Sequence, residues 1–191
     1  MTGNGATLPP VLLPVRDRLT RAPRADEGLL FHDLALTDLI RLSSAVELPQ
    51  AVDLDSVEGM AADAAALAFL VGRLGIRIIV SRRPALIRRA AELGCVPLLH
   101  VHCLDSTGLE RALQGHPGRP VGTALSPGLI LAHLPAWQRQ TLPQPVLAYG
   151  LLRRPEEVAA AVEAGAAAVV LSPAPSLDRP PRRLYNARLE S

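Results

Sequence analysis

Charged side chains stand at the ends of several short apolar runs, where they could contact a small ligand. Arg16 directly follows the first run, and it is interpreted either as a ligand-binding residue or as a surface arginine. Asp53 lies within the third run. A carboxylate accepts two hydrogen bonds from a diol, although a buried aspartate paired with an arginine fits the pattern equally well. Arg82 and Arg83 follow the fourth run, and we expect one of them to face the same site.

A glycine and a serine follow the last two apolar runs. Gly150 comes directly after the run at 146–149, and Ser172 comes after the run at 168–171. In parallel barrels the loops after the seventh and eighth strands often bind phosphate through backbone N–H groups, where glycine permits close approach and serine adds a hydroxyl donor. The spacing therefore indicates a phosphate site, although a tight turn at Gly150 and a helix cap at Ser172 explain it as well.

Histidines, cysteines and one further aspartate receive structural interpretations. His100 and His102 alternate along one run, so both should point to the same face of a strand, but no third residue stands at metal-ligand spacing. We therefore expect no metal. Asp105 is interpreted as a helix cap. Cys95 and Cys103 lie in apolar runs rather than at disulfide spacing, which indicates small core residues in a reduced, cytoplasmic protein.

Apolar runs alternate with helical stretches at intervals of about 20 to 25 residues. The predicted strands are 11–15, 29–32, 51–54, 77–80, 97–101, 122–125, 146–149 and 168–171. The predicted helices are 36–44, 59–72, 84–93, 106–114, 127–138 and 155–163. Eight strands joined by helical crossovers predict an α/β fold, a compact (β/α)₈ TIM-like barrel, with an open doubly wound sheet as the alternative.

Composition excludes several classes of function. The chain has 191 residues, 20 basic and 18 acidic side chains, and every basic residue is arginine. Without lysine there is no Schiff base and no Walker-type phosphate lysine. A net charge of +2 and 3% aromatic residues exclude the strongly basic or base-stacking surfaces of autonomous nucleic-acid binders. No apolar stretch reaches the roughly 20 residues of a membrane helix, so no membrane partner is expected.

The ends of the chain differ in composition from the part between them. Residues 1–10 are predicted to be a flexible N-terminus, 11–178 a single TIM-like barrel domain, and 179–191 an Arg-rich C-terminal tail.

Several segments in order resemble the glycerol-3-phosphate responsive antiterminators, the family of glycerol uptake operon regulators. The resemblance covers about residues 11 to 175. The matching segments are LPVRD (13–17), VDL (52–54), VSRRPALIRRAAELG (80–94), CLDSTGLERAL (103–113), SPGLI (126–130) and AYGLLRRPEEVAAAVEAGAAAVVLS (148–172).

The resemblance implies a TIM-barrel regulator without catalysis or cofactor that binds glycerol 3-phosphate at the barrel mouth. The liganded form then acts on the leader of a glycerol-metabolism messenger RNA and prevents early termination, with a homodimer as a further possibility. It adds Arg83 and Arg153 to the ligand-binding residues, because both align with family arginines. Tyr149 joins them beside Gly150, where the family pattern has paired glycines.

The chain also departs from the family pattern in the strands. His100 stands where an arginine is common, and Ala124 replaces a usual acidic residue. Two alternatives to the regulator therefore stay open: a small isomerase- or aldolase-like enzyme, and a scaffold that binds no ligand.

RNA contacts, in the regulator interpretation, must come from arginines. The expected patches are Arg88 and Arg89 on one helix and Arg182 and Arg183 in the tail, with Arg179 and Arg188 nearby.

Overall fold

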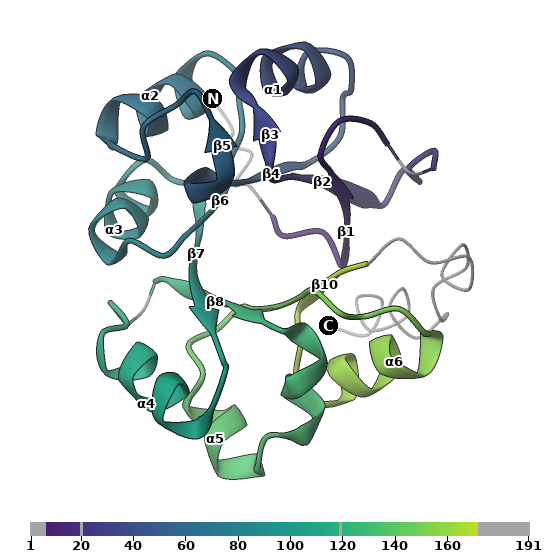
Figure 1. The fold of residues 1–191 in the computed structure, drawn as a ribbon, viewed down its shortest axis with the longest axis vertical. Helices are drawn as coiled ribbons and strands as arrows, with labels where there is room; N and C mark the ends of the chain where they lie inside the picture. The colour runs from purple at the N-terminus through teal and green to yellow at the C-terminus, as the bar shows by residue number, and fades with distance from the viewer. Residues whose placement is uncertain (1–6, 20, 119, 172–191) are drawn as a thin grey trace.

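The computed structural model describes residues 7–19, 21–118 and 120–171 and shows a closed barrel of eight parallel strands (Figure 1). The strands are β1 (Val11–Val15), β2 (Glu27–Phe31), β4 (Gln50–Asp53), β6 (Ile78–Ser81), β7 (Val96–His102), β8 (Gly122–Ser126), β9 (Val146–Tyr149) and β10 (Ala168–Val170). β1 pairs with β2 on one side and with β10 on the other, which closes the sheet. The predicted barrel is confirmed, and the open doubly wound sheet is wrong.

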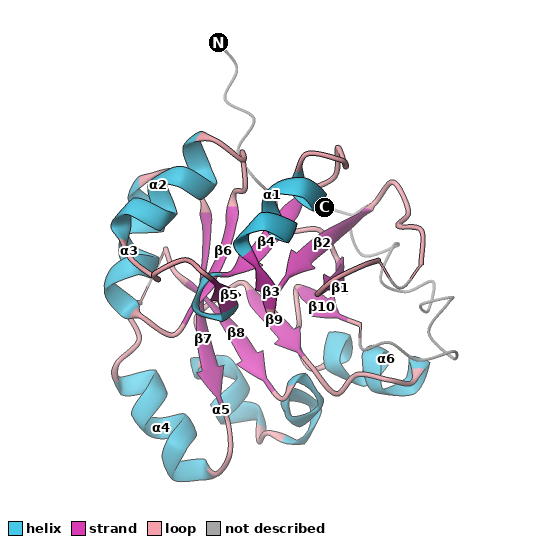
Figure 2. Ribbon diagram, turned by 45° about the horizontal axis from the view of Figure 1, so that its top comes forward, coloured by secondary structure: helices cyan, strands magenta, loops and turns pink. Residues whose placement is uncertain are grey.

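Helices surround the barrel on the outside (Figure 2). They are α1 (Leu36–Ser43), α2 (Ala64–Gly72), α3 (Pro84–Glu92), α4 (Ser106–Gln114), α5 (Ala136–Thr141) and α6 (Pro155–Glu163). Two 3₁₀ helices, η1 (Leu54–Ser56) and η2 (Gly128–His133), follow β4 and β8, and a small two-stranded sheet joins β3 (Leu34–Ala35) to β5 (Val57–Glu58). Within the described residues, no helix is long and apolar enough to cross a membrane.

The barrel strands are apolar on both faces because both faces are buried. One cluster packs between the strands and the helices and includes Leu29 and Phe31. The other fills the barrel interior, and its members are Leu8, Leu12, Leu30, Ala51, Ile78, Val80, Leu98, Ala124, Leu147, Ala168 and Val170. Successive strand residues point to opposite faces, so every second residue joins the interior. This alternation determines which side chains reach the mouth.

Leu8 extends the barrel interior towards the N-terminus. Its side chain is buried and packs with the interior cluster, so the packed domain begins before the predicted boundary at residue 11. The other predicted domain boundary, and the tail at 179–191, lie outside the described residues and stay predictions.

Two predicted helices differ from the structure. The helix predicted at 59–72 begins only at Ala64, because the Asp63 carboxylate caps it by accepting the Ala66 N–H at 2.9 Å. The helix predicted at 127–138 is split into η2 and α5. Pro135 stands at the break in an extended conformation, and its missing N–H and rigid ring do not allow a helix to continue through it.

The first crossover contains no helix in its described residues, 16–19 and 21–26, and none is among the predicted helices. A buried carboxylate anchors it instead: Glu27, at the start of β2, accepts hydrogen bonds from the Arg21 guanidinium at 2.6 and 2.8 Å and from the Arg24 N–H at 2.9 Å. Burial alone would raise the pKa of Glu27, but these hydrogen bonds and charges outweigh it and hold the pKa below its ordinary value.

Candidate ligand-binding site

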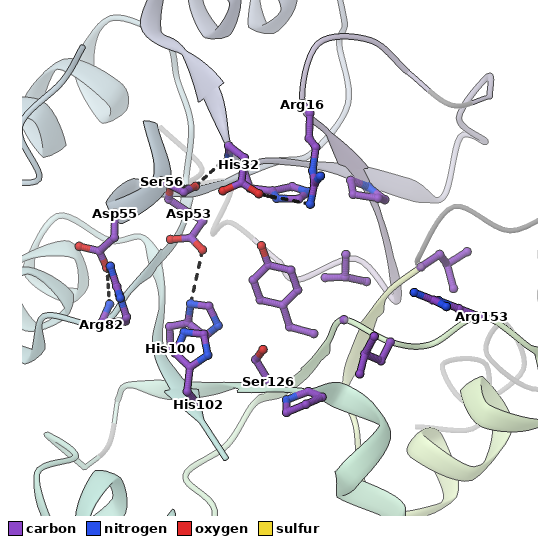
Figure 3. Close-up of a pocket in the computed structure, with 18 of the residues that line it drawn as sticks. Arg16, His32, Asp53, Asp55, Ser56, Arg82, His100, His102, Ser126 and Arg153 are labelled. Carbon is purple, nitrogen blue, oxygen red and sulfur yellow. Dashed lines mark hydrogen bonds and ion pairs between the residues drawn. The ribbon is translucent and has the colours of Figure 1, made fainter. Parts of the chain in front are cut away.

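A cavity of about 900 Å³ opens at the C-terminal ends of the barrel strands (Figure 3). This volume suits a small metabolite, and this face of a TIM barrel is where binding sites are found. The residues that line it are Pro14, Arg16, Asp17, Arg18, His32, Asp33, Asp53, Asp55, Ser56, Arg82, His100, His102, Ser126, Pro127, Tyr149, Gly150, Leu151, Arg153, Val170 and Leu171.

The floor of the cavity carries a buried aspartate and histidine. Oδ2 of Asp53, at the end of β4, lies 3.4 Å from Nδ1 of His100 on β7, and the two side chains are only 8% and 6% exposed. The sequence allowed either a carboxylate that binds a diol or a buried aspartate paired with an arginine. Asp53 is buried, but its partner is a histidine rather than an arginine. The pair brings together two strands that are far apart in the sequence.

Aromatic rings pack together beside this pair. The Tyr149 ring stacks on His100 with centroids 5.0 Å apart, and it meets His32 edge-on at 6.0 Å. The ring centroids of His100 and His102 are 4.2 Å apart, which confirms that these two histidines share one face of their strand. Burial raises the pKa of the Tyr149 hydroxyl, and the charges of Asp53 and Asp33 raise it further. The ring is therefore a neutral part of the cavity wall.

Three polar atoms of the floor are buried without a hydrogen-bond partner: His32 Nε2, Asp53 Oδ1 and His100 Nε2. The other ring nitrogen of His32 lies 3.1 Å from Asp33 Oδ2. Burial lowers the pKa of His32, and the Asp33 carboxylate only partly opposes that effect. His32 is therefore neutral near pH 7.

Ion pairs surround the floor. Arg16 lies 3.3 Å from Asp33, and the guanidinium groups of Arg82 and Arg83 lie 3.7 and 3.1 Å from the buried carboxylate of Asp55. The Ser81 hydroxyl donates to the same carboxylate at 2.9 Å. The rim therefore holds its arginines in place through carboxylates.

Arg82 lines the cavity and Arg83, the residue singled out by the sequence, does not. The alternation of the strand explains the difference. Val80 points into the barrel, so Arg82 two residues later points into the mouth, whereas Arg83 becomes the N-cap residue of α3 and turns to Asp55.

The other predicted ligand residues within the described chain meet at this one cavity: Arg16, Asp53, Tyr149, Gly150 and Arg153. Ser172 lies outside the described residues. Gly150 has a φ of +86°, and a Cβ added to it would meet nothing within 4 Å. The glycine is therefore favoured by its backbone conformation rather than by a close neighbour in the chain.

Glu157 fixes the loop that carries Arg153. Its carboxylate accepts the backbone N–H groups of Arg153 and Arg154 at 2.8 and 3.0 Å and the Arg154 Nε at 2.7 Å. Glu157 lies in the first turn of α6, where proline opens the helix as predicted.

Of the arginines predicted to contact RNA, Arg88 and Arg89 do not line this cavity. Arg88 and Arg89 are exposed on α3, where Arg89 pairs with Glu92 at 2.6 Å. Arg182 and Arg183 lie outside the described residues. The interpretation of Asp105 as a cap is confirmed, because its carboxylate accepts the Gly108 N–H at 2.6 Å.

Sequence reasoning assigned no role to His32, Asp33 and Asp55. His32 stands two residues beyond Leu30, which fills the barrel interior, so strand alternation could have placed it at the mouth. The two aspartates act through pairs with residues on other crossovers, which no local pattern reveals. Over the part of the chain that the structure describes, no group of three or more His, Cys, Asp or Glu side chains is placed to hold a metal ion.

Replacing Gly128 with alanine should lower the free energy of unfolding by about 1–3 kcal/mol, because overpacking forces backbone shifts. The new Cβ would lie 2.6 Å from the Tyr149 nitrogen and 2.7 Å from the Ala148 carbonyl carbon. Urea unfolding measures the effect. Gly72→Ala is the control, since nothing lies within 4 Å of its added Cβ and no loss of stability is expected. Equal stabilities for the two variants would contradict the close packing of η2 on β9.

Stability should fall as the pH drops below about 6.5, the ordinary pKa of histidine. Burial lowers the pKa values of His32, His102 and His116. Each therefore binds a proton more readily in the unfolded chain, so acid favours unfolding, whereas above this range all are neutral in both states. The midpoint of thermal unfolding should be level from pH 7.5 to 8.5 and decline from about pH 6.5 to 5. A midpoint that rises over that acidic range would contradict these directions.

The closed (β/α)₈ barrel with a cavity at its C-terminal mouth defines this chain as a TIM-barrel protein with a candidate ligand-binding site. The sequence profile of the glycerol-3-phosphate responsive antiterminators matches residues 29–175, and the chain belongs to that family. Among curated proteins, none matches the chain significantly.

Solved structures with the same fold include two named for the same operon. The glycerol uptake operon antiterminator regulatory protein of Listeria monocytogenes str. 4b F2365 is 23% identical, with a TM-score of 0.66 over 76% of this chain and 80% of that chain. A glycerol uptake operon antiterminator-related protein of Thermotoga maritima MSB8 is 20% identical, with a TM-score of 0.66 over 85% and 93%. A native KDPGal structure is 17% identical, with a TM-score of 0.53 over 85% and 82%. At these identities the likeness establishes the fold.

Proposed function

We propose that this chain binds glycerol 3-phosphate in the barrel mouth and, in the liganded form, acts on the leader of a glycerol-metabolism messenger RNA to prevent early termination. Membership of the antiterminator family supports the role. The choice of this ligand rests on one observation: a single cavity has arginines on its rim and unpartnered polar atoms on its floor. A molecule with a phosphate at one end and hydroxyls at the other matches both. The proposal includes no catalysis, no cofactor and a place in the cytoplasm, where messenger RNA is found.

The phosphate is expected beside Arg153 and Gly150. Charges in the cavity lining are balanced, with four arginines (Arg16, Arg18, Arg82 and Arg153) and four aspartates (Asp17, Asp33, Asp53 and Asp55). Figure 3 shows Arg153 across the cavity from Asp53 and Asp55. A dianion is repelled by those carboxylates and attracted to the opposite side. Ser172, which lies outside the described residues, stays a proposed phosphate ligand. Arg16 lies between the two sides, and Arg83 would act by holding Asp55.

Calorimetric titration tests ligand binding directly. Glycerol 3-phosphate should bind and raise the unfolding midpoint, whereas inorganic phosphate and glycerol should each bind far more weakly, because each satisfies only one end of the cavity. No binding of any phosphorylated three-carbon compound at millimolar concentration would contradict the proposed ligand.

RNA binding should depend on ligand and fall steeply with salt. Titrating a structured leader fragment by fluorescence anisotropy, with and without glycerol 3-phosphate, measures both effects. If Arg88 and Arg89 contact phosphates, replacing both with alanine should reduce the slope of log K against log [salt] by about 0.7–0.9 for each arginine. Replacing Arg41, which pairs with Asp38 on α1, is the matched control. Equal weak binding with and without ligand would favour a scaffold over a regulator.

An enzyme is the second candidate function, favoured by the pair of Asp53, at the end of β4, and His100, on β7. Such a pair is the usual form of a general base with its orienting carboxylate. Proton NMR of triose phosphates in deuterated water, with the protein present, would reveal exchange at the carbon next to the carbonyl. Exchange that is lost in His100→Gln would establish an isomerase-like activity, and no exchange supports the regulator. We also propose that the chain forms a homodimer, and light scattering in the same buffer tests it.

A further inference from the structure

The unpartnered atoms of the cavity floor come from three different strands or strand ends. His32 follows β2, Asp53 ends β4 and His100 lies on β7, and their side chains are 8%, 8% and 6% exposed. Buried polar atoms are nearly always hydrogen-bonded, because a missing bond leaves their desolvation uncompensated. Three such atoms on the lining of one cavity therefore point to a ligand that supplies the missing bonds.

All three atoms are hydrogen-bond acceptors. Nδ1 of His100 faces Asp53 Oδ2 at 3.4 Å, and Nδ1 of His32 faces Asp33 Oδ2 at 3.1 Å. A lone pair at either Nδ1 would point at a carboxylate oxygen, so we assign the proton to Nδ1 in each ring. Nε2 of a neutral ring then carries a lone pair, and Asp53 Oδ1 is an acceptor because the group is a carboxylate. The floor thus requires donors from its ligand.

We propose that this floor is a hydroxyl-specific subsite that selects an alcohol over the corresponding ketone or deoxy compound. The inference rests on the proposed function, because it assumes a phosphorylated three-carbon ligand whose phosphate lies at the rim. Glycerol 3-phosphate offers two hydroxyl donors to the acceptors. Dihydroxyacetone phosphate has a carbonyl at the central carbon, where its oxygen would face other acceptors, and propyl phosphate has no hydroxyl at all.

The Tyr149 ring packs against two of the side chains that carry these acceptors. It stacks on His100 and lies edge-on to His32, and the acceptor atoms are shielded from solvent. A ligand hydroxyl bound to these atoms would therefore have little competition from water. Exclusion of water strengthens the discrimination between donor and acceptor groups.

The test compares four ligands on the wild-type chain by calorimetry: glycerol 3-phosphate, dihydroxyacetone phosphate, propyl phosphate and phosphoethanolamine. Glycerol 3-phosphate should bind about 10- to 100-fold more tightly than the ketone and the deoxy compound, as expected for hydrogen bonds that include one to a charged acceptor. Phosphoethanolamine places an ammonium donor at the floor. If it binds more tightly than glycerol 3-phosphate, the subsite is for an amine and the hydroxyl proposal is overturned.

A substitution at His32 tests the contribution of the floor to ligand preference separately from that of the rest of the cavity. His32→Phe removes one unpartnered acceptor, preserves the edge contact with Tyr149 and leaves the exposed Asp33 paired with Arg16. The variant should unfold at the same or a higher temperature and lose at least threefold of its preference for glycerol 3-phosphate over propyl phosphate. The control is His116→Phe. His116 donates to the Gly122 carbonyl at 3.1 Å and accepts the Gly118 N–H at 3.0 Å, so its loss should lower the unfolding temperature and leave the preference unchanged.

The outcomes separate a failure of the hydroxyl subsite from a failure of the proposed function on which it rests. Equal affinities for glycerol 3-phosphate and propyl phosphate would overturn the subsite and leave a phosphate-binding regulator. Binding of glycerol, but of none of the phosphorylated compounds, would support the subsite and overturn the proposed ligand. If neither glycerol nor any of the four compounds binds, both proposals are wrong. An unchanged preference in His32→Phe would overturn the assignment of His32 to the subsite.

Discussion

Replacing Glu27 with alanine should lower the free energy of unfolding by about 3–5 kcal/mol, the usual cost of removing one partner from a buried ion pair. The Glu27 side chain is completely buried, and Arg21, its partner, is 19% exposed. The substitution leaves the guanidinium largely buried without its carboxylate, and it also removes the acceptor of the Arg24 N–H. The first crossover, whose described residues form no helix, would lose its anchor.

Urea unfolding followed by circular dichroism measures this change. Glu27→Gln should be affected less, because an amide oxygen can still accept one of the hydrogen bonds. Asp38→Ala is the control, since the exposed pair of Asp38 and Arg41 contributes below about 1 kcal/mol. A Glu27→Ala variant as stable as the Asp38→Ala variant would show that the crossover does not depend on the buried pair.

Replacing Arg153 with alanine should weaken glycerol 3-phosphate binding by about 10- to 100-fold, which corresponds to about 1.4–2.8 kcal/mol. Hydrogen bonds between charged groups in a partly closed site contribute on this scale. Arg153 lies on the side of the cavity away from Asp53, and its backbone is held by Glu157. Lysine at this position should recover part of the affinity, because it keeps the charge and loses the planar geometry.

Calorimetry on Arg153→Ala and Arg88→Ala separates the effect of a direct contact between Arg153 and the ligand from the effect of the protein's overall charge. Both variants lose one positive charge, but Arg88 lies outside the cavity lining. Arg88→Ala should bind glycerol 3-phosphate as the wild type does, at an unchanged unfolding temperature. If both variants weaken binding equally, the arginine acts through the overall charge, and the phosphate does not lie beside residue 153.

Prediction from sequence succeeded for the strands because every one is buried on both faces. A short continuous apolar run such as Val146–Tyr149, bounded by turn residues, fits a strand that is buried on both faces, and the structure places β9 at those residues. Helices were harder to delimit, since caps decide where they begin. Asp63 and Pro135 moved the starts of α2 and α5 away from the periodic pattern.

Position along one strand was sufficient to place Arg16, Asp53 and Gly150 at strand ends, which the barrel brings together at one cavity. The role of these residues in binding a ligand stays a prediction. Pairing across the barrel was not predictable in the same way. The partner of Asp53 is His100, which depends on the width of the barrel and on the direction of both side chains.

Alternation along the strands separates the residues that hold the barrel together from those that would choose a ligand. Leu30, Ala51 and Leu98 fill the interior, and the cavity residues His32, Asp53 and His100 stand two positions further along the same strands. Mutations in the upper layer can therefore alter the cavity lining while the lower layer keeps its packing. Two solved structures share this fold at only 20–23% identity and a TM-score of 0.66. For protein engineering, the layer of side chains directly above the barrel interior, which includes His32, Asp53 and His100, is the one to vary.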